Sequence, residues 1–79
     1  MSSKNTAKII GERLSEFRRK RSITQAELAA PLGVSRSMIA KYEAGAKPIS
    51  AHRLKEISKI LKVSTDYLLG LTDNPKPRH

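Results

Sequence analysis

The chain has 79 residues, with 16 Lys and Arg against 7 Asp and Glu, which gives a formal net charge of +9 and a pI near 10.4. That length suffices for a single small domain with a limited core. The chain contains no cysteine, which excludes disulfides, thiolate metal sites and a catalytic thiol. Residues 1–6 are small and polar, so no secretory signal is predicted, and no apolar run approaches the ~18 residues of a membrane span. We therefore expect a cytoplasmic protein.

The excess of positive charge is the strongest feature of the composition. It favours a polyanionic partner, for which nucleic acid and an anionic membrane are the two candidates. A merely soluble basic protein is the third alternative. For so small a chain we favour nucleic acid.

The first predicted helix covers residues 6–20. Its apolar side chains recur at spacings of three and four and make a single stripe, formed by Ala7, Ile10, Leu14 and Phe17. Gly11 is a weak helix former there, and is tolerated if another backbone packs closely against it. A basic run, 18–21, closes the helix, where cations suit the negative end of the helix dipole.

The second predicted helix covers 25–32. Thr24 and Glu27 have the spacing of a capping box at its start, and Gly33 is placed to end it in the left-handed conformation. Leu28, Ala29 and Leu32 form its inner face. Pro31 predicts a short or kinked last turn, because its ring removes an amide and crowds the preceding turn.

Three further helices are predicted at 36–43, 51–62 and 65–69, capped in turn by Ser35, Ser50 and Ser64. Their inward side chains are Ile39 and Tyr42 in the first, and Leu54, Ile57 and Leu61 in the second. No strand signal is present. We expect an all-α domain over 6–70 with its helix-turn-helix at about 24–45, a flexible N-terminal arm over 1–5, and a disordered basic tail over 71–79.

Several spaced motifs support a family resemblance. They are Ile10-Gly11-Glu12-Arg13-Leu14, then Arg18, Thr24-Gln25-Ala26-Glu27-Leu28-Ala29, Leu32-Gly33-Val34-Ser35-Arg36-Ser37-Met38-Ile39 and Tyr42-Glu43-Ala44-Gly45. Together they closely resemble the Cro and lambdoid-repressor (Xre) helix-turn-helix family, and 61–70 resembles the end of its five-helix domain. The chain departs from the family at Pro31 and at Ala44, where an Asn that can touch phosphate is common. The resemblance implies a compact lambda-repressor-like fold.

The resemblance implies that the helix at 36–43 lies in the major groove with its first turn at the base edges. Arg36 is the first candidate for reading a base, since a guanidinium can donate two bonds to guanine; clamping a phosphate is the alternative. Ser37 is either a base reader or a helix-start residue, and Met38 either touches a thymine methyl or is an exposed spacer. Lys41 reaches a base or a phosphate.

The candidate phosphate ligands lie around the helix starts. By resemblance Gln25 bonds a phosphate beside the free amides of its helix start. Tyr42 is first a core residue, with its hydroxyl available to phosphate. The remaining candidates are Ser35, Lys47, Ser50 and His52, although His52 is equally well explained as an exposed side chain.

The family resemblance also implies contacts between helices and between copies. Arg18 and Glu43 are expected to form a partly buried ion pair that orients the recognition helix. The candidates for a dimer interface are Tyr67, Leu68 and Leu71, and Ile9 is a further one. Tyr67 and Leu68 equally suit the core of one copy. The predicted function is a repressor that binds a palindromic operator in double-stranded DNA as a homodimer. The alternative is an antitoxin or anti-regulator acting on a protein partner.

Other function classes fit the residues poorly. The chain has only His52 and His79 as histidines, and it lacks the sequence motifs of metalloproteases and phosphate-binding loops. We therefore predict no enzyme activity, cofactor, metal or small-molecule ligand. A membrane-binding first helix would need Leu14 and Phe17, which the small core requires.

Overall fold

The computed structural model describes the backbone of residues 5–77 and the side chains of residues 6–77. This part of the chain contains helices and no strand. The helices are α1 (Asn5–Lys20), α2 (Gln25–Leu32), α3 (Arg36–Glu43), α4 (Ala51–Leu61) and α5 (Thr65–Leu68). The predicted all-α five-helix architecture is confirmed. The expected N-terminal arm lies outside the described residues except for Asn5, which begins α1, and residues 78–79 also lie outside them.

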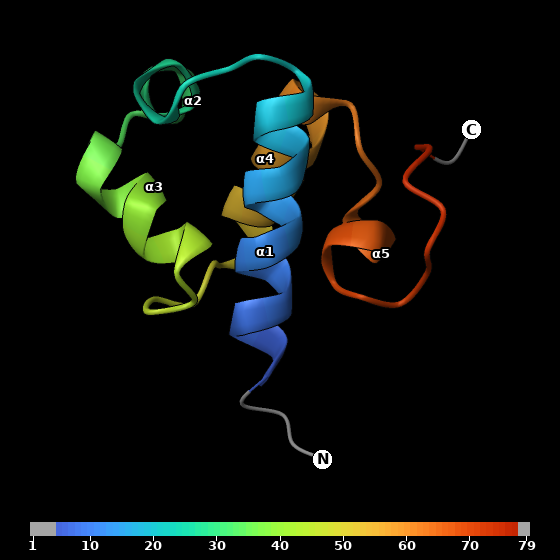
Figure 1. Cartoon of the computed structure of the whole chain (residues 1–79). Helices are drawn as coiled ribbons and strands as arrows, with labels where there is room; N and C mark the ends of the chain where they lie inside the picture. Colours follow the sequence, from blue (N-terminus) through green and yellow to red (C-terminus); the bar gives the residue numbers. More distant parts are fainter. Residues whose placement is uncertain (1–4, 78–79) are drawn as a thin grey trace.

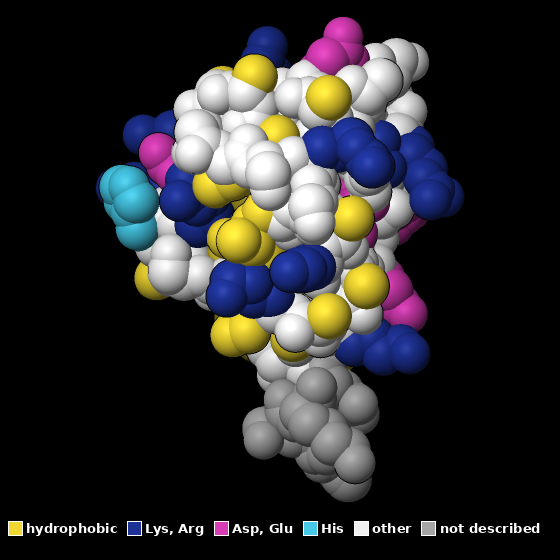
Figure 2. Space-filling model, turned by 90° about the vertical axis from the view of Figure 1, so that its left-hand side faces the viewer, with side chains coloured by type: hydrophobic (Ala, Val, Ile, Leu, Met, Phe, Trp, Pro, Cys, Tyr) yellow, Lys and Arg dark blue, Asp and Glu magenta, His cyan; other side chains and the backbone are white. Residues whose placement is uncertain are grey.

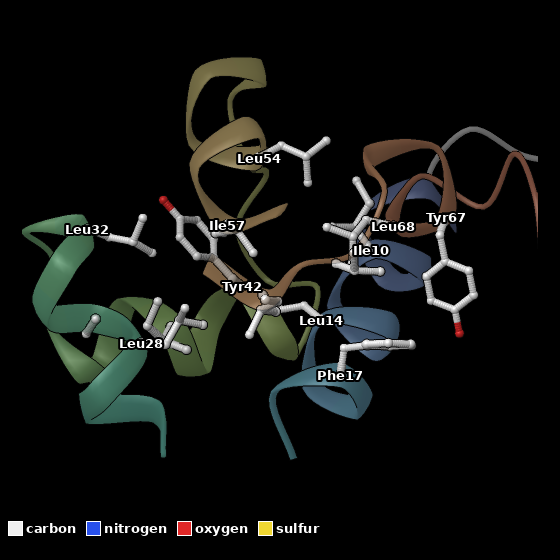
Figure 3. Close-up of a cluster of buried hydrophobic side chains, with 14 residues drawn as sticks. Ile10, Leu14, Phe17, Leu28, Leu32, Tyr42, Leu54, Ile57, Tyr67 and Leu68 are labelled. Carbon is white, nitrogen blue, oxygen red and sulfur yellow. The ribbon is translucent and has the colours of Figure 1, made fainter. Parts of the chain in front are cut away.

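The long helix α1 stands at the centre of the molecule (Figure 1). It contacts α3 on one side and α5 on the other, while α4 contacts α2 and α5. Side chains from every helix meet in one core (Figure 3), and the largest fully buried ones are Leu14, Leu28, Ile39, Ile57, Leu61, Leu68 and Val63. With so few apolar side chains, the placement of α3 depends on each contact between α1, α2 and α3.

The predicted helix starts are present as hydrogen-bonded caps. At α2, the Glu27 amide donates to Thr24 Oγ1 at 3.0 Å and the Thr24 amide donates to Glu27 Oε1 at 2.9 Å, which completes the capping box. Ser35, Ser50 and Ser64 each accept from a backbone amide in the first turn of α3, α4 and α5. These caps fix where each helix begins.

The helix ends follow the prediction with small shifts. Helix α2 ends at Leu32, directly after Pro31, and Gly33 takes the left-handed conformation with φ 70°. Pro31 lies in the last turn of α2, where its ring removes the one amide that would otherwise bond the Glu27 carbonyl. Helix α4 ends at Leu61, one residue earlier than predicted, because Lys62 adopts φ 56° as its left-handed cap.

Gly11 marks the closest approach between α1 and the end of α3. A Cβ atom at Gly11 would lie 2.5 Å from the backbone carbonyl oxygens of Tyr42 and Glu43. No side chain fits at that distance, so this position requires glycine. The backbone contact anticipated from the sequence holds the carboxyl end of α3 directly against α1.

Residues 71–77, part of the tail that the sequence predicts to be disordered, make hydrogen bonds to α1 and to the start of α5. Arg13 Nη1 donates to the carbonyl oxygens of Tyr67 and Thr72, each at 2.8 Å, and the Ser64 amide donates to the Pro75 carbonyl at 2.9 Å. The segment follows a defined path because its carbonyl groups find donors on α1 and at the start of α5. The sequence pattern did not predict these hydrogen bonds, because Arg13 is distant in sequence from Tyr67 and Thr72.

Candidate nucleic-acid interface

The outer face of α3 carries exposed polar and cationic side chains. Ser35, Arg36, Ser37 and Lys41 are all exposed along it, whereas Ile39 and Tyr42 are buried on its inner face. Figure 2 looks onto the α2–α3 side, where Lys and Arg side chains are spread across the surface and acidic ones lie at its margins. The arrangement presents hydrogen-bond donors and positive charge outward from a single helix.

Met38 and Tyr42 differ from the other candidates because the core uses them. Met38 is half-buried and packs against the core cluster, so only part of it faces outward. Tyr42 is 6% exposed, with its ring among the core side chains (Figure 3). Any contact that Tyr42 makes with a partner therefore comes from its hydroxyl.

The starts of α2 and α4 flank α3. Gln25 is half-buried, while Lys47, Ser50 and His52 are exposed. Ser35 and Ser50 use their oxygens to accept from the amides of Met38 and Arg53, each at 3.1 Å, which leaves each hydroxyl hydrogen as a donor. Helix starts with free amides and hydroxyl donors suit an anionic ligand.

Arg18 and Glu43 form an ion pair inside the molecule. Arg18 donates through Nε and Nη2 to the two carboxylate oxygens of Glu43, and the side chains are only 10% and 8% exposed. Arg18 also donates from Nη1 to the Ile23 carbonyl at 2.8 Å. This pair ties α1 to the last residue of α3 and to the turn before α2.

Two hydrogen bonds that the sequence analysis missed connect this pair to the outer face. Gln25 Nε2 donates to Glu43 Oε1 at 3.0 Å, and Arg36 Nη1 donates to Gln25 Oε1 at 3.1 Å. Gln25 and Arg36 were each predicted to face DNA, but nothing in their spacing indicates that they bond to each other. The contact arises because the turn after α2 brings the starts of α2 and α3 together.

Three other arginines donate hydrogen bonds to backbone carbonyls at the ends of helices. Arg13 donates to the Tyr67 carbonyl at the end of α5, Arg21 Nε to the Leu61 carbonyl at the end of α4, and Arg53 Nη1 to the Leu32 carbonyl at the end of α2. These carbonyls lack partners within their own helices. Together with Arg18, four of the 16 Lys and Arg side chains thus bond to groups within the fold.

Two of the dimer candidates, Tyr67 and Leu68, lie in the core of the single copy. Tyr67 is 9% exposed and Leu68 fully buried, so the core of one copy already uses both side chains. Leu71 is 73% exposed and Ile9 is 36% exposed. A Cβ atom at Gly70 would lie 3.1 Å from Ile9 Cγ2, so Ile9 adjoins the end of α5. Ile9 and Leu71 are the large apolar side chains left open on the described surface.

Tyr67 sits between α1 and α5 in a polar and aromatic setting. Its hydroxyl donates to Glu16 Oε1 at 3.2 Å, its ring meets Phe17 edge-on, and Arg13 lies over its face. Burial, and then the neighbouring Glu16 carboxylate, raise the pKa of Tyr67 above its ordinary value. Tyr67 thus stays a neutral hydrogen-bond donor within the fold.

Other kinds of site find little support in residues 5–77. No group of acidic, histidine or cysteine side chains there is arranged to hold a metal ion. No helix within that range is long and apolar enough to cross a membrane.

Comparison with known proteins gives the family. The Helix-turn-helix family profile matches residues 14–68, which include the capped pair α2–α3 and the core around it. The chain belongs to the helix-turn-helix family. The resemblance to Cro and lambdoid repressors is confirmed, and most of the motifs that carry it lie within the matched range, except for residues 10–13 and 69–70.

Curated relatives in this helix-turn-helix family cover most of the chain. An uncharacterized HTH-type transcriptional regulator, YobD of Bacillus subtilis, is 36% identical over 67 residues, which are 85% of this chain and 60% of that protein. An uncharacterized transcriptional regulator in the ATPase CF(0) region of Rhodospirillum rubrum is 40% identical over 70 residues, 89% of this chain and 65% of that protein. The chain thus spans less than two thirds of their length.

Solved structures show the same helix-turn-helix fold. The P22 c2 repressor, crystallised in complex with synthetic operator 9T, matches with a TM-score of 0.74 and 36% identity, over 80% of this chain and 96% of that one. The controller protein C.AhdI from Aeromonas hydrophila matches with a TM-score of 0.77 and 24% identity, over 86% of this chain and 99% of that one. The latter likeness concerns the fold alone.

Proposed function

We propose that this helix-turn-helix chain binds double-stranded DNA and regulates transcription. The observation that carries the proposal is the outer face of α3, where Ser35, Arg36, Ser37 and Lys41 are exposed together. A helix of this kind fits the major groove, where each base pair presents a distinct pattern of donors and acceptors. The names of the relatives as transcriptional regulators, and the operator bound by the P22 c2 repressor, support the same function.

In this proposal the start of α3 reads the bases. Arg36 donates two bonds to O6 and N7 of a guanine, which is worth about 1–3 kcal/mol of discrimination. Ser37 bonds a neighbouring base edge, and the outward part of Met38 contacts a thymine methyl. Lys41, one turn further along α3, reaches either a base or a phosphate.

The phosphates are bound by groups on both sides of α3. Gln25 and Ser35 lie at the starts of α2 and α3, and Lys47, Ser50 and His52 lie around the start of α4. Their donors supply affinity without sequence information. The Tyr42 hydroxyl joins them, its ring being held in the core.

We further propose that two copies bind a palindromic operator and repress transcription by blocking polymerase. Two recognition helices then lie one turn of DNA, ~34 Å, apart. Ile9 and Leu71 support a contact between copies, because both are exposed large apolar side chains and Ile9 adjoins the end of α5, close in sequence to Leu71. We also propose that the protein acts in the cytoplasm, at the nucleoid, and that it has no enzymatic activity.

The test is selection from a pool of random duplexes, followed by affinity measurements against salt. We expect enrichment of a palindrome with half-sites about 10 base pairs apart, and Arg36→Ala should relax one base position in each half. Leu71→Glu should weaken assembly in sedimentation and lower affinity for the palindrome. Binding that depends steeply on salt but is blind to sequence would contradict the proposal.

A further inference from the structure

Arg13 gathers the chain around the end of α5 onto one guanidinium. Its Nη1 donates to the carbonyl oxygens of Tyr67 and Thr72, each at 2.8 Å, and its Nη2 donates to Asp73 Oδ1 at 3.3 Å. The guanidinium also lies over the Tyr67 ring, 4.1 Å from the ring centroid. Residues 67–73 are therefore folded around a single, half-buried side chain of α1.

Leu71 lies inside the segment that Arg13 holds. The two carbonyls that Arg13 Nη1 bonds come before and after Leu71 in the sequence. The Leu71 amide donates to the Asp66 carbonyl at 2.9 Å, and Gly70 turns the chain with φ 82°. The backbone is thus bonded on both sides of Leu71, while the Leu71 side chain is 73% exposed.

Ile9 adjoins this turn from α1. It precedes Arg13 by four residues, so the two side chains share one face of the helix. A Cβ atom at Gly70 would lie 3.1 Å from Ile9 Cγ2, which places Ile9 against the residue before Leu71. We define Ile9, Gly70 and Leu71 as the Ile9–Leu71 patch. It shares no residue with the proposed DNA interface, so a second copy can occupy it while α3 stays exposed.

A mobile loop at this patch would have to be ordered when two copies meet. Ordering chain on association costs free energy, and a segment that is held beforehand avoids part of that cost. In a two-fold dimer the same patch is used by both copies, so the saving is made twice. We propose that Arg13 is a positioning residue for assembly, which bonds the carbonyls on both sides of Leu71 and so holds the Ile9–Leu71 patch ready for a second copy of this chain. The inference rests on the proposed dimer.

Arg21 offers a matched comparison, because it makes the same kinds of contact elsewhere. Its Nε and Nη2 donate to the carbonyls of Leu61 and Lys62 at 2.8 and 3.2 Å, and its guanidinium lies 5.7 Å from the centroid of the Phe17 ring. Leu61 is buried and Lys62 is a cation, so Arg21 holds no exposed apolar side chain in place. Variants of the two arginines should therefore both lower stability but differ in assembly.

The test is the dimer dissociation constant, measured by sedimentation at a temperature where thermal melts show every variant to be folded. Arg13→Gln removes one charge and is too short to reach both carbonyls, and we expect it to raise the dissociation constant about tenfold. Arg21→Gln removes the same charge and should stay within about twofold of wild type. Arg13→Lys keeps the charge and a donor, and its dissociation constant should lie between those of wild type and Arg13→Gln.

Two further measurements show whether Arg13 acts through Leu71. The double variant of Arg13→Gln with Leu71→Glu should assemble no more weakly than Leu71→Glu alone. In the Leu71→Glu background, which keeps the copies apart, ¹⁵N relaxation of the backbone amides of residues 71–73 reports the order of the segment. Arg13→Gln should make these amides more mobile, and Arg21→Gln should leave them unchanged.

The outcomes separate this inference from the proposed function. If wild type stays monomeric both free and on the selected palindrome, the proposed dimer fails, and the role of Arg13 fails with it. If wild type dimerises and Leu71→Glu disrupts the dimer, but both Arg13 variants keep the wild-type dissociation constant, only the inference is overturned. Equal weakening by Arg13→Gln and Arg21→Gln would overturn it as well, since lost stability would then explain both.

Discussion

Arginines at the helix ends and cations on α3 carry the same charge in different surroundings. Arg13 and Arg21 donate to backbone carbonyls at the ends of α5 and α4, where those carbonyls lack partners within the helix. Lys41 is exposed on the face of α3. Net charge alone therefore overstates the charge available to DNA, because it counts both the cations that stabilise the fold and the cations that face outward.

The Arg18–Glu43 pair connects these two surroundings. It lies in the interior, but through Gln25 it reaches the exposed Arg36. One chain of hydrogen bonds thus connects residues that stabilise the fold with a residue that we propose reads a base. Substitutions on either side of it test how sharply stability and recognition are separated.

The largest expected effect follows from Glu43→Ala. Removing the carboxylate leaves the Arg18 guanidinium buried without its partner, which costs about 3–5 kcal/mol of unfolding free energy. Binding to the selected duplex should weaken at the same time, since α3 and Gln25 lose an anchor. Urea denaturation and duplex titration measure the two effects. Glu12→Ala, which removes an exposed glutamate from α1, is the control; wild-type values for Glu43→Ala in both assays would show that the pair is not structural.

Gly11→Ala tests the backbone contact between α1 and α3. The added methyl group would lie 2.5 Å from two carbonyl oxygens that cannot move without displacing the end of α3. We expect a loss of about 1–3 kcal/mol, as for other overpacked sites. In a domain of this size each kcal/mol lowers Tm by about 4–8 °C. A variant as stable as Glu12→Ala would show that α3 can withdraw from α1 without cost.

The sequence predicted the helices well and the contacts among arginines poorly. Caps such as Thr24–Glu27 and terminators such as Gly33 are local, so a few adjacent residues determine them. Arg13 and Arg21, by contrast, donate to the carbonyls of Tyr67 and Lys62, which lie more than forty residues away in the sequence. Only the folded chain brings these groups together. For the basic run 18–21 the sequence therefore predicted only a favourable place at the negative end of the helix dipole.

The candidate site shows the same limit. Arg36, Ser37 and Lys41 could be placed on one outward face because helical periodicity determines which residues share it. That Tyr67 and Leu68 belong to the core was left open, because a short apolar helix suits a core or an interface equally. Gln25 was expected to face phosphate, and its bonds to Glu43 and Arg36 depend on how α2 and α3 pack.

Arg21→Gln and Lys41→Gln remove one positive charge each, from the two sides of the comparison. Arg21→Gln should lower stability by about 1.5 kcal/mol, because the Leu61 carbonyl loses a charged donor, and should leave the salt dependence of DNA binding nearly unchanged. Lys41→Gln should alter stability by less than about 0.5 kcal/mol. If Lys41 contacts a phosphate, the slope of log affinity against log salt becomes shallower by about one.

These two variants control for each other, since their change in net charge is identical. Equal salt slopes with equal stabilities would mean that overall charge, rather than its place in the fold, governs binding. A lowered base discrimination in Lys41→Gln, without a change of slope, would instead assign Lys41 to a base.

Among the variants of buried residues, the smallest loss of stability is expected at Tyr67, and it depends on pH. Tyr67→Phe keeps the ring between Phe17 and Arg13 but removes the bond to Glu16, at a cost of about 0.5–1.5 kcal/mol at neutral pH. Because the pKa of Tyr67 is raised in the folded state, the folded protein holds the phenolic proton more tightly than the unfolded chain. Its contribution is therefore complete below the ordinary value of 10.0 and is lost as pH rises above it. Urea denaturation at pH 8 and at pH 11 should show the stability advantage of wild type over Tyr67→Phe shrinking at the higher pH. An advantage that stays constant would mean that burial beside Glu16 does not favour the neutral phenol.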